Sequence, residues 1–244
     1  MNFCIIIPTR YNSSRFPGKV FVNILGKPMI QRVWERCIEV TNEVYIATPN
    51  DNIMQYCERS GIRSILTSIN CKTGTDRIAE ASEKLDKKYD IIINVQGDEP
   101  VILPEDILAI INSVSFKNKQ ISYCGMCKIK NEEDFRNPNI IKIVTTKSNN
   151  LLYASRAPIP TTKQKQFVNA YKQVCIYAFT PYILSIFRKF KKGKLEEIED
   201  IEILRLLENR YNIKMVEVSD SSISVDVQED VKKVEDFLRR NENV

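Results

Sequence analysis

The chain has 244 residues, of which 43% are hydrophobic and 27% charged, a balance typical of a soluble globular protein with one sizeable core. Because the sequence has neither an apolar run of eighteen or more residues nor a charged-then-apolar leader, we expect a cytoplasmic protein with no membrane partner. The net charge of +5 is spread over interleaved acidic and basic residues, which argues against nucleic-acid binding, and the absence of histidine excludes mechanisms that need an imidazole base.

The first motif is a cationic loop after an apolar strand. The β-branched run Ile5–Ile7 predicts a buried strand that ends at Pro8. Open α/β sheets bind ligands beyond the carboxyl ends of their strands, and at that position this chain has Arg10, Ser13, Arg15 and Lys19. Such a loop suits a polyanion such as a triphosphate, and the alternative is a solvated surface loop. Neither a dinucleotide-binding glycine motif nor a P-loop motif is present.

Helical and strand-like patterns then alternate along the chain. An amphipathic helix is expected from Pro28 onward. It is followed by a strand at 44–48, a short helix around 53–57, a strand near 64–67, a helix around 78–85 and a strand at 91–95. This alternation predicts an α/β fold in which helices cover a parallel sheet.

Small hydroxyl residues and a glycine precede the helix expected around 78–85. The first backbone N–H groups of a helix have no partner within it, so those near Thr73, Gly74 and Thr75 are available to a base or ribose. A plain helix cap by Thr73 or Thr75 explains the pattern equally well. The local sequence leaves both interpretations open.

An acidic motif, Gln96-Gly97-Asp98-Glu99, follows the strand at 91–95. Asp98 is therefore expected at the carboxyl end of that strand, beside the predicted phosphate crevice. Mg²⁺ commonly takes one or two carboxylates and completes its shell with phosphate oxygens and water. Asp98 suits such a site; Glu99 is a weaker candidate because adjacent side chains in a strand point apart.

The cysteines predict no metal site. There are seven of them, scattered along the chain, which fits reduced thiols better than a disulfide framework. Cys124 and Cys127 form a C-x-x-C pair in a strand-like stretch, but the chain offers neither histidine nor a second pair for a structural zinc. We expect both cysteines in the core.

The second half of the chain adds strands near 140–144, 173–179 and 213–218, a helix over Leu195–Arg205 and a final helix from Val231. Arg156 has the planar guanidinium that binds a carboxylate bidentately, and the alternative is an ordinary surface arginine. Asp226 precedes the final helix, where a plain helix cap is the alternative to a ligand role.

These motifs resemble those of the CMP-Kdo synthetases (3-deoxy-manno-octulosonate cytidylyltransferases) over nearly the whole chain, about residues 3–240. The resemblance rests on P-x-R-Y-x-S-x-R-x-P-G-K from Pro8, T-G-T-D-R from Thr73 and V-Q-G-D-E-P from Val95. It also includes N-P-N-x-x-K-x-V, S-R-x-x-I-P and V-D-x-x-E-D in the second half. Together these segments give the resemblance far more specificity than a single glycine-rich motif has.

The resemblance implies an α/β, Rossmann-like nucleotidyltransferase fold with a mostly parallel central sheet flanked by helices. It implies a single domain, 1–244, with a smaller sugar-binding and dimerisation excursion at about 130–190, and a homodimer. The implied reaction transfers CMP from CTP to the anomeric hydroxyl of an acidic 2-keto sugar, Kdo or a close relative, with Mg²⁺ as cofactor and release of pyrophosphate. Such an activated sugar serves lipopolysaccharide or capsule synthesis.

The resemblance also implies roles for individual residues. Catalytic roles fall on Arg10, Lys19, Asp98 and Asp226, of which Asp98 and Asp226 would bind the metal. Nucleotide binding falls on Pro8, Thr9, Arg10, Ser13, Arg15, Lys19, Thr73, Gly74, Thr75, Arg77, Gln96 and Asp98. Sugar binding falls on Gln96, Lys142, Arg156, Gln173, Tyr177 and Glu202, with Lys142 projecting from a strand toward phosphate or the reacting acid.

This chain departs from the family pattern mainly on the sugar side. Gln173, Cys175 and Ile203 stand where the family has His, Gly and Gln, and Cys71 replaces a His near the nucleotide. Two alternatives therefore remain. The same chemistry could use another acceptor, such as 8-amino-Kdo, another nonulosonate-like acid or a phosphonate, or the chain could be a non-catalytic nucleotide-binding module.

Overall fold

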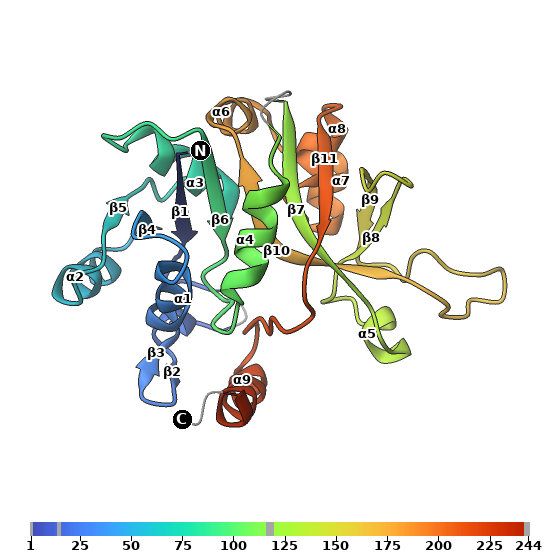
Figure 1. The fold of residues 1–244 in the computed structure, drawn as a ribbon, viewed down its shortest axis with the longest axis horizontal. Coiled ribbons are helices and arrows are strands. Elements are labelled where there is room, and N and C mark those ends of the chain that lie inside the picture. Colours follow the sequence, from blue (N-terminus) through green and yellow to red (C-terminus); the bar gives the residue numbers. More distant parts are fainter. Residues whose placement is uncertain (1, 14–15, 116–119, 242–244) are drawn as a thin grey trace.

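A mixed sheet forms the centre of the molecule. The computed structural model describes residues 2–13, 16–115 and 120–241. Within them the sheet runs in the order β11-β7-β10-β6-β1-β4-β5, and β8 and β9 extend it from β10 (Figure 1). Its strands are β1 Phe3–Pro8, β4 Val44–Thr48, β5 Ser64–Leu66, β6 Ile91–Val95, β7 Ile121–Lys128, β8 Lys142–Thr145, β9 Leu151–Ser155, β10 Tyr171–Phe179 and β11 Asn212–Glu217.

Strand directions bring the ends of β1 and β6 to one edge of the sheet. β1 pairs in parallel with β4 and with β6, so both strands finish at the same side. β10 instead runs antiparallel to β6 and to β7. The predicted α/β fold with a mostly parallel sheet is confirmed; the antiparallel pairs are those of β10 with β6, β7 and β8 and that of β8 with β9.

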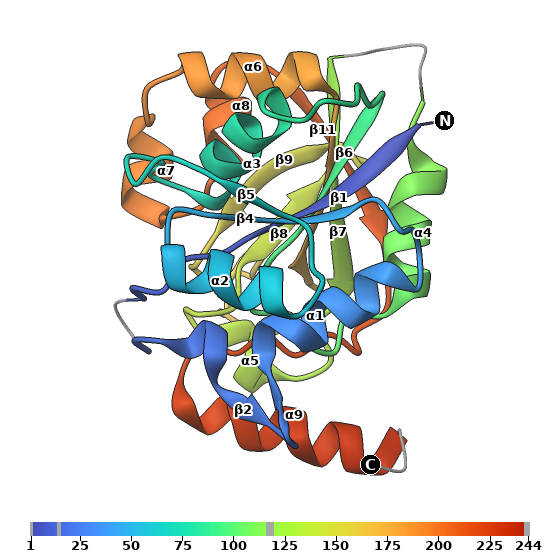
Figure 2. The ribbon, with the colours of Figure 1, turned by 90° about the vertical axis from the view of Figure 1, so that its left-hand side faces the viewer.

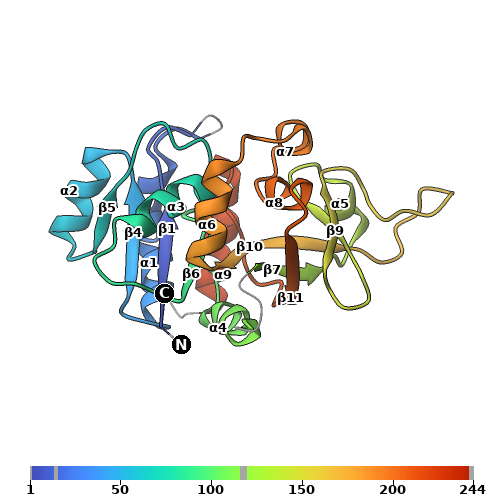
Figure 3. The same cartoon turned by 90° about the horizontal axis from the view of Figure 1, so that it is seen from above.

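Helices cover both faces of this sheet. They are α1 Met29–Ile38, α2 Asp51–Arg59, α3 Gly74–Glu83, α4 Pro104–Ser113, α5 Glu132–Arg136, α6 Pro181–Lys189, α7 Lys194–Glu199, α8 Leu204–Glu208 and α9 Gln228–Asn241. Helices α3, α6 and α8 share one core cluster, whereas α1, α2 and α4 share another on the opposite face. Figure 3 shows α6 and α4 on opposite sides of the strands. In α1 the buried residues Ile30, Val33 and Cys37 recur at helical spacing, which explains why this face packs inward.

The last helix packs beside a small two-stranded element. Val231, Val234 and Leu238 of α9 join a cluster with Ile24 and Met29. Ile24 belongs to β2 Asn23–Ile24, which follows the 3₁₀ helix η1 Lys19–Phe21 and pairs with β3 Lys27–Pro28, and Met29 is the first residue of α1. Figure 2 shows α9 alongside β2, remote from the sheet. This packing ties the C-terminal segment to the chain that follows the cationic loop.

The helix predicted over Leu195–Arg205 is interrupted. It is divided into α7 and α8, and Asp200 between them has a left-handed backbone with φ of 52°. Side chains of the interrupted segment itself make contacts that fit the break: Glu202, between α7 and α8, accepts bonds from the start of α3, and Arg205 of α8 reaches back to Glu196 of α7. A continuous helix would not bring both groups to these partners.

The predicted excursion at about 130–190 contains α5, β8, β9, β10 and α6. In Figure 1 the hairpin β8–β9 and the segment that leads to β10 lie at the end of the molecule opposite α2. Cys124 and Cys127 are buried in β7, as expected for core cysteines. In the described part of the chain, every helix is too short or too polar to cross a membrane.

Candidate active site

A cleft of about 670 Å³ opens beyond the carboxyl ends of β1 and β6, where the sequence predicts the phosphate crevice. Most of the predicted site residues line it. These are Pro8, Thr9, Arg10, Ser13, Lys19, Thr73, Gly74, Arg77, Gln96, Asp98, Arg156, Glu202 and Asp226. The remaining cation of the loop, Arg15, lies outside the described residues.

Two carboxylates from distant parts of the chain face one cation in this cleft. The Lys19 ammonium donates to Asp98 Oδ2 at 2.8 Å and lies 3.8 Å from Asp226 Oδ1. It also donates to the carbonyl of Val225 at 2.9 Å, and the Val225 N–H in turn donates to the carbonyl of Asp98. These bonds fix the segment before α9 against the end of β6. Two convergent carboxylates around a positive charge fit the donor set that Mg²⁺ takes in phosphate sites.

The helix-cap alternative for Asp226 does not account for its carboxylate. The carboxylate of Asp230 accepts the backbone N–H groups of Asp226 and Val227, both at 3.1 Å, just ahead of α9. Asp230 therefore serves the start of the helix. The side chain of Asp226 lines the cleft, and its Oδ1 lies 3.8 Å from the Lys19 ammonium.

The turn after β6 approaches the end of β1 so closely that only glycine fits at position 97. A Cβ atom there would lie 2.8 Å from Thr9 Cγ2 and 2.9 Å from the carbonyl oxygen of Pro8. Such contacts are well inside van der Waals distance. Gly97 thus allows Asp98 to follow β6 directly into the cleft.

The start of α3 is capped, and its first N–H groups are occupied. Thr73 accepts from the Asp76 N–H and Asp76 accepts from that of Thr73, a capping box. The carboxylate of Glu202 then accepts from the N–H groups of Gly74 at 2.9 Å and Thr75 at 2.8 Å. The expectation that these N–H groups are free for a base or ribose is therefore wrong, because a carboxylate from the α7–α8 connection occupies them. Thr75 is buried and does not line the cleft. Thr73 both caps α3 and lines the cleft.

Arg77 reaches the cleft from a buried position. Its guanidinium donates to Thr67 Oγ1 at 2.6 Å and to the Ser68 carbonyl at 3.4 Å, and burial lowers its pKa. Cys71 lines the same wall, and its thiol donates to Glu80 at 3.3 Å. Burial and this carboxylate raise the pKa of Cys71 to about 11, so the thiol stays neutral.

Arg156 holds two loops together at the rim. Its guanidinium donates to the carbonyls of Glu199 at 2.5 Å, Pro138 at 3.0 Å and Asp200 at 3.2 Å. The side chain remains 32% exposed and lines both the cleft and a neighbouring cavity. It is therefore a built-in part of the site rather than an ordinary surface arginine, and its contact with a substrate carboxylate stays a prediction.

The side chain of Lys142 lines neither the cleft nor the smaller cavity that adjoins it. Its side chain is fully buried, and the amine donates to the carbonyls of Asn137 at 2.7 Å and Ile140 at 2.6 Å. The expectation that it projects toward phosphate or the reacting acid is corrected here. Lys142 instead holds the 137–140 turn, whose residues Pro138 and Asn139 line the cleft.

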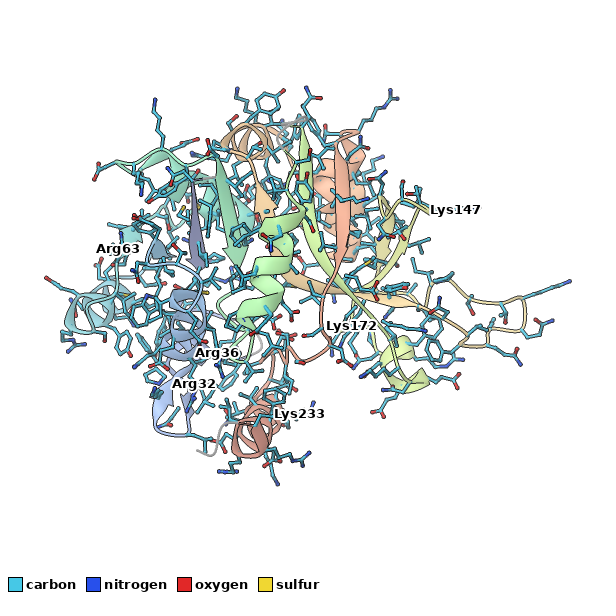
Figure 4. All side chains as sticks on the ribbon, in the orientation of Figure 1. Arg32, Arg36, Arg63, Lys147, Lys172 and Lys233 are labelled. Atoms are coloured by element: carbon cyan, nitrogen blue, oxygen red, sulfur yellow. The ribbon has the colours of Figure 1, made fainter. Side chains whose placement is uncertain are left out.

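A second cavity of about 270 Å³ adjoins the cleft and shares Gln96, Asp98, Arg156, Glu202 and Asp226 with it. The predicted sugar-side residues Gln173 and Tyr177 of β10 line this second cavity. So does Lys172, which Figure 4 shows between β10 and the segment that leads to α9.

Sequence reasoning named Glu99 only as a weaker metal candidate than Asp98, and it missed Lys72 and Lys192. Glu99 lies against the second cavity, accepts from the Ser222 hydroxyl, and has its pKa raised to about 8 by burial and by Asp98. Its place beside Asp98 in the acidic motif was the available signal. Lys72 and Lys192 line the first cleft but belong to no recognisable spacing.

Comparisons with known proteins agree with this geometry. Residues 4–215 match the family model described as "Cytidylyltransferase". A 3-deoxy-manno-octulosonate cytidylyltransferase of Geobacter metallireducens is 38% identical over 257 residues, covering 98% of this chain and 99% of the relative. The mitochondrial enzyme of that name from Arabidopsis thaliana is also 38% identical, covering 96% of this chain and 82% of the relative.

Solved structures give the same result. A CTP complex of CMP:2-keto-3-deoxy-manno-octonic acid synthetase superposes with a TM-score of 0.89 and 32% identity, covering 98% of this chain and 99% of that one. 4-Diphosphocytidyl-2C-methyl-D-erythritol synthase from Anaerococcus prevotii, at 17% identity and a TM-score of 0.62, shares the fold. The chain belongs to the cytidylyltransferase family and, within it, to the 3-deoxy-manno-octulosonate cytidylyltransferases (CMP-Kdo synthetases).

Proposed function

We propose that the protein transfers CMP from CTP to the anomeric hydroxyl of 3-deoxy-manno-octulosonate (Kdo) and releases pyrophosphate. The observation that carries this proposal is the convergence of Lys19, Asp98 and Asp226 at the mouth of two adjoining cavities. One cavity is large enough for a nucleotide and the other for a sugar acid, and the acidic pair lies at their junction. Full-length similarity to Kdo cytidylyltransferases supports the choice of substrates.

We place the triphosphate at the end of β1. Arg10 and Lys19 neutralise its charge. Arg10 is an exposed residue of the loop, whereas Lys19 is fixed by its hydrogen bond to Asp98. Gln96 and Arg77 lie further along the same cleft, toward the capped start of α3, where we place the nucleoside. The acceptor's anomeric oxygen attacks the α-phosphorus, and the bond from that phosphorus to the oxygen of pyrophosphate breaks. Positioning and charge neutralisation carry most of the rate in such transfers, which suits a chain without histidine.

Asp98 and Asp226 would hold the Mg²⁺. When bound, the ion withdraws charge from the phosphate oxygens of the nucleotide. The Lys19 ammonium marks the position between these two carboxylates where positive charge is favourable. Each carboxylate is 28% exposed, so solvent and phosphate oxygens have access to both.

The proposed function is tested with the purified chain, CTP, Mg²⁺ and Kdo. We expect pyrophosphate release that requires both substrates, together with a product of the mass of CMP-Kdo. A panel of other acids, including 8-amino-Kdo, another nonulosonate-like acid and a phosphonate, identifies a different acceptor if Kdo is inactive. Thermal protection by CTP without turnover on any acid would contradict catalysis and favour a nucleotide-binding module.

The metal role is tested by Asp98→Asn, with Asp86→Asn as the matched control. Asp86 is exposed and remote from both cavities, so we expect normal activity from its variant. Asp98→Asn should lower turnover by about 100-fold or more while the melting temperature stays near that of the wild type, since one carboxylate ligand is lost. Near-normal turnover at low Mg²⁺ would refute the metal role.

We also propose a homodimer formed through the 130–190 excursion. Large apolar side chains are exposed there, Leu152 by 54% and Val168 by 72%. Exposed apolar residues of this size are favourable at an interface between subunits. Sedimentation of the wild type and of a Leu152→Glu, Val168→Glu double variant tests this, and an unchanged mass would refute it.

A further inference from the structure

A row of lysines borders the cleft in the connection between α6 and α7. The run Arg188–Lys194 contains five cations in seven residues and no carboxylate. Its arginine pairs with Glu83 of α3, whereas the ammonium groups of the four lysines have no hydrogen-bond or ion-pair partner among the described residues. Three of these lysines are exposed and the other lines the cleft, in that order Lys189, Lys191, Lys194 and Lys192.

A fifth unpaired lysine reaches the same cleft from another segment. Lys72 precedes α3, is exposed, and lines the cleft together with Lys192. Arg10 of the cationic loop, also exposed, lines it as well. The five lysines therefore add to the positive charge at which we place the triphosphate. We call them the basic rim: Lys72, Lys189, Lys191, Lys192 and Lys194.

Two carboxylates that lie close to this connection are engaged with other partners. Glu196 is buried against Arg205. Glu208 accepts the N–H groups of Leu195 at 3.1 Å and of Glu196 at 3.3 Å, at the start of α7. Gly193 approaches Glu208 so closely that a Cβ atom would have no room there. The connection is thus held through its backbone, and neither carboxylate neutralises the lysines.

Unpaired cations at the opening of a cleft attract an incoming polyanion before it makes contact. Charges act on one another through solvent over about one Debye length, ~10 Å at 0.1 M salt. A cleft lined by one sign of charge raises association rates by about 10- to 1000-fold. Lys191 and Lys194 stand within two residues of Lys192, which lines the cleft, so their charges act on the same opening.

We propose that the basic rim steers CTP into the cleft, so that these lysines set the rate at which the nucleotide associates. This inference rests on the proposed function and deepens it, because it assigns the route by which the nucleotide enters. The triphosphate is the most highly charged group among the proposed substrates and gains most from the rim. An acceptor with a single carboxylate gains less.

The test measures association and dissociation of CTP that carries a fluorescent label on its ribose, by stopped flow with Mg²⁺ and without acceptor. The variant is Lys191→Gln with Lys194→Gln. Neither residue lines either cavity, so the contacts of the bound nucleotide stay intact. At about 10 mM salt we expect the association rate constant to fall by about 3- to 10-fold, with dissociation unchanged. At about 1 M salt, where the Debye length is about 3 Å, the difference should vanish.

Three further variants separate charge from other effects. Lys191→Arg with Lys194→Arg keeps the charge and should associate like the wild type. Lys88→Gln with Lys147→Gln makes the same change in net charge at exposed positions outside both cavities, and should also behave like the wild type. Glu197 is exposed on α7 and carries the opposite charge, so Glu197→Gln should raise the association rate constant at low salt.

The outcomes separate this inference from the proposed function, for which pyrophosphate release from CTP and Kdo is measured alongside. If Kdo is turned over but Lys191→Gln with Lys194→Gln associates as fast as the wild type at low salt, steering is refuted and the reaction stands. Faster dissociation with unchanged association would also refute it, because the lysines would then contact the bound nucleotide. If the wild type binds no CTP, both proposals fail.

Discussion

Arg205 is the cation on which a buried charge cluster beside the cleft depends. Its side chain is 3% exposed, and it donates to both oxygens of Glu196 at 2.7 Å and to Asp76 Oδ1 at 2.7 Å. Its guanidinium also lies over the ring of Phe187, 3.9 Å from the centroid. Glu196 is 1% exposed, so its carboxylate has no access to water that could replace the arginine.

Replacing Arg205 with methionine keeps most of the side-chain volume and removes the charge. Breaking a buried ion pair in this way leaves the partner uncompensated and costs about 3–5 kcal/mol. For a domain of this size each 1 kcal/mol shifts the melting temperature by about 2–4 °C, so we expect a decrease of about 6–20 °C. Thermal and urea unfolding at pH 7 measure the loss.

The matched control is Arg59→Met. Arg59 is exposed at the end of α2 and, among the described residues, bonds only to a carbonyl of its own helix, so its variant should stay within about 0.5 kcal/mol of the wild type. A double variant, Arg205→Met with Glu196→Gln, should regain part of the loss because the fully buried charge of Glu196 is then removed as well. A decrease below about 1 kcal/mol for Arg205→Met alone, with Glu196 unchanged, would refute the argument from burial.

Two further changes probe the frame of the site and a remote carboxylate. Gly97→Ala would force a Cβ against Thr9 and the carbonyl of Pro8. We therefore expect the free energy of unfolding to fall by about 1–3 kcal/mol and the KM for CTP to rise. A variant with normal KM and stability would show that the close approach is not needed. Hydrogen bonds, led by that from Tyr89, lower the pKa of Glu43 to about 2, from 4.5 in the absence of such bonds. Because the folded pKa is the lower one, the stabilisation is present above about pH 4.5 and is lost as the pH falls toward 2. The stability difference between wild type and Glu43→Gln should therefore be constant from pH 7 to about pH 5 and shrink in acid; a difference that does not change with pH would contradict this.

Elements with a clear hydrophobic period could be predicted because their signal is local. The apolar runs of β1 and β6 and the helical spacing in α1 all correspond to observed elements. The cleft was also predictable from this pattern, since the carboxyl ends of neighbouring parallel strands must meet at one edge of a sheet. Asp98 follows the end of β6 by three residues and Lys19 follows the end of β1 by eleven, and both line the cleft.

Errors arose where a side chain is used by a partner far along the chain. Glu202 and the N–H groups of α3 are 128 and 127 residues apart, so neither segment alone indicates that they bind each other. The same contact explains why the helix over Leu195–Arg205 breaks at Asp200 despite its helical composition. For Lys142 the strand was predicted correctly, but alternation gives only the face of a strand and not whether a neighbouring turn will occupy the amine.

The two halves of the site differ in how their residues are positioned, and this bears on how specificity changes. Short loops after β1 and β6 supply the groups near the phosphates, and close approaches such as that at Gly97 fix their backbone. The second cavity, where the acceptor is proposed to bind, instead draws on β10, which is bulged between Val174 and Tyr177; a Cβ atom at Gly125 of the neighbouring strand β7 would lie 3.0 Å from the carbonyl oxygen of Val174. Side chains there are held by one another, so a change at Gln173 alters the partners of Tyr177 without moving Lys19 or Asp98. Acceptor preference can therefore diverge within this family while the chemistry at the phosphates is retained.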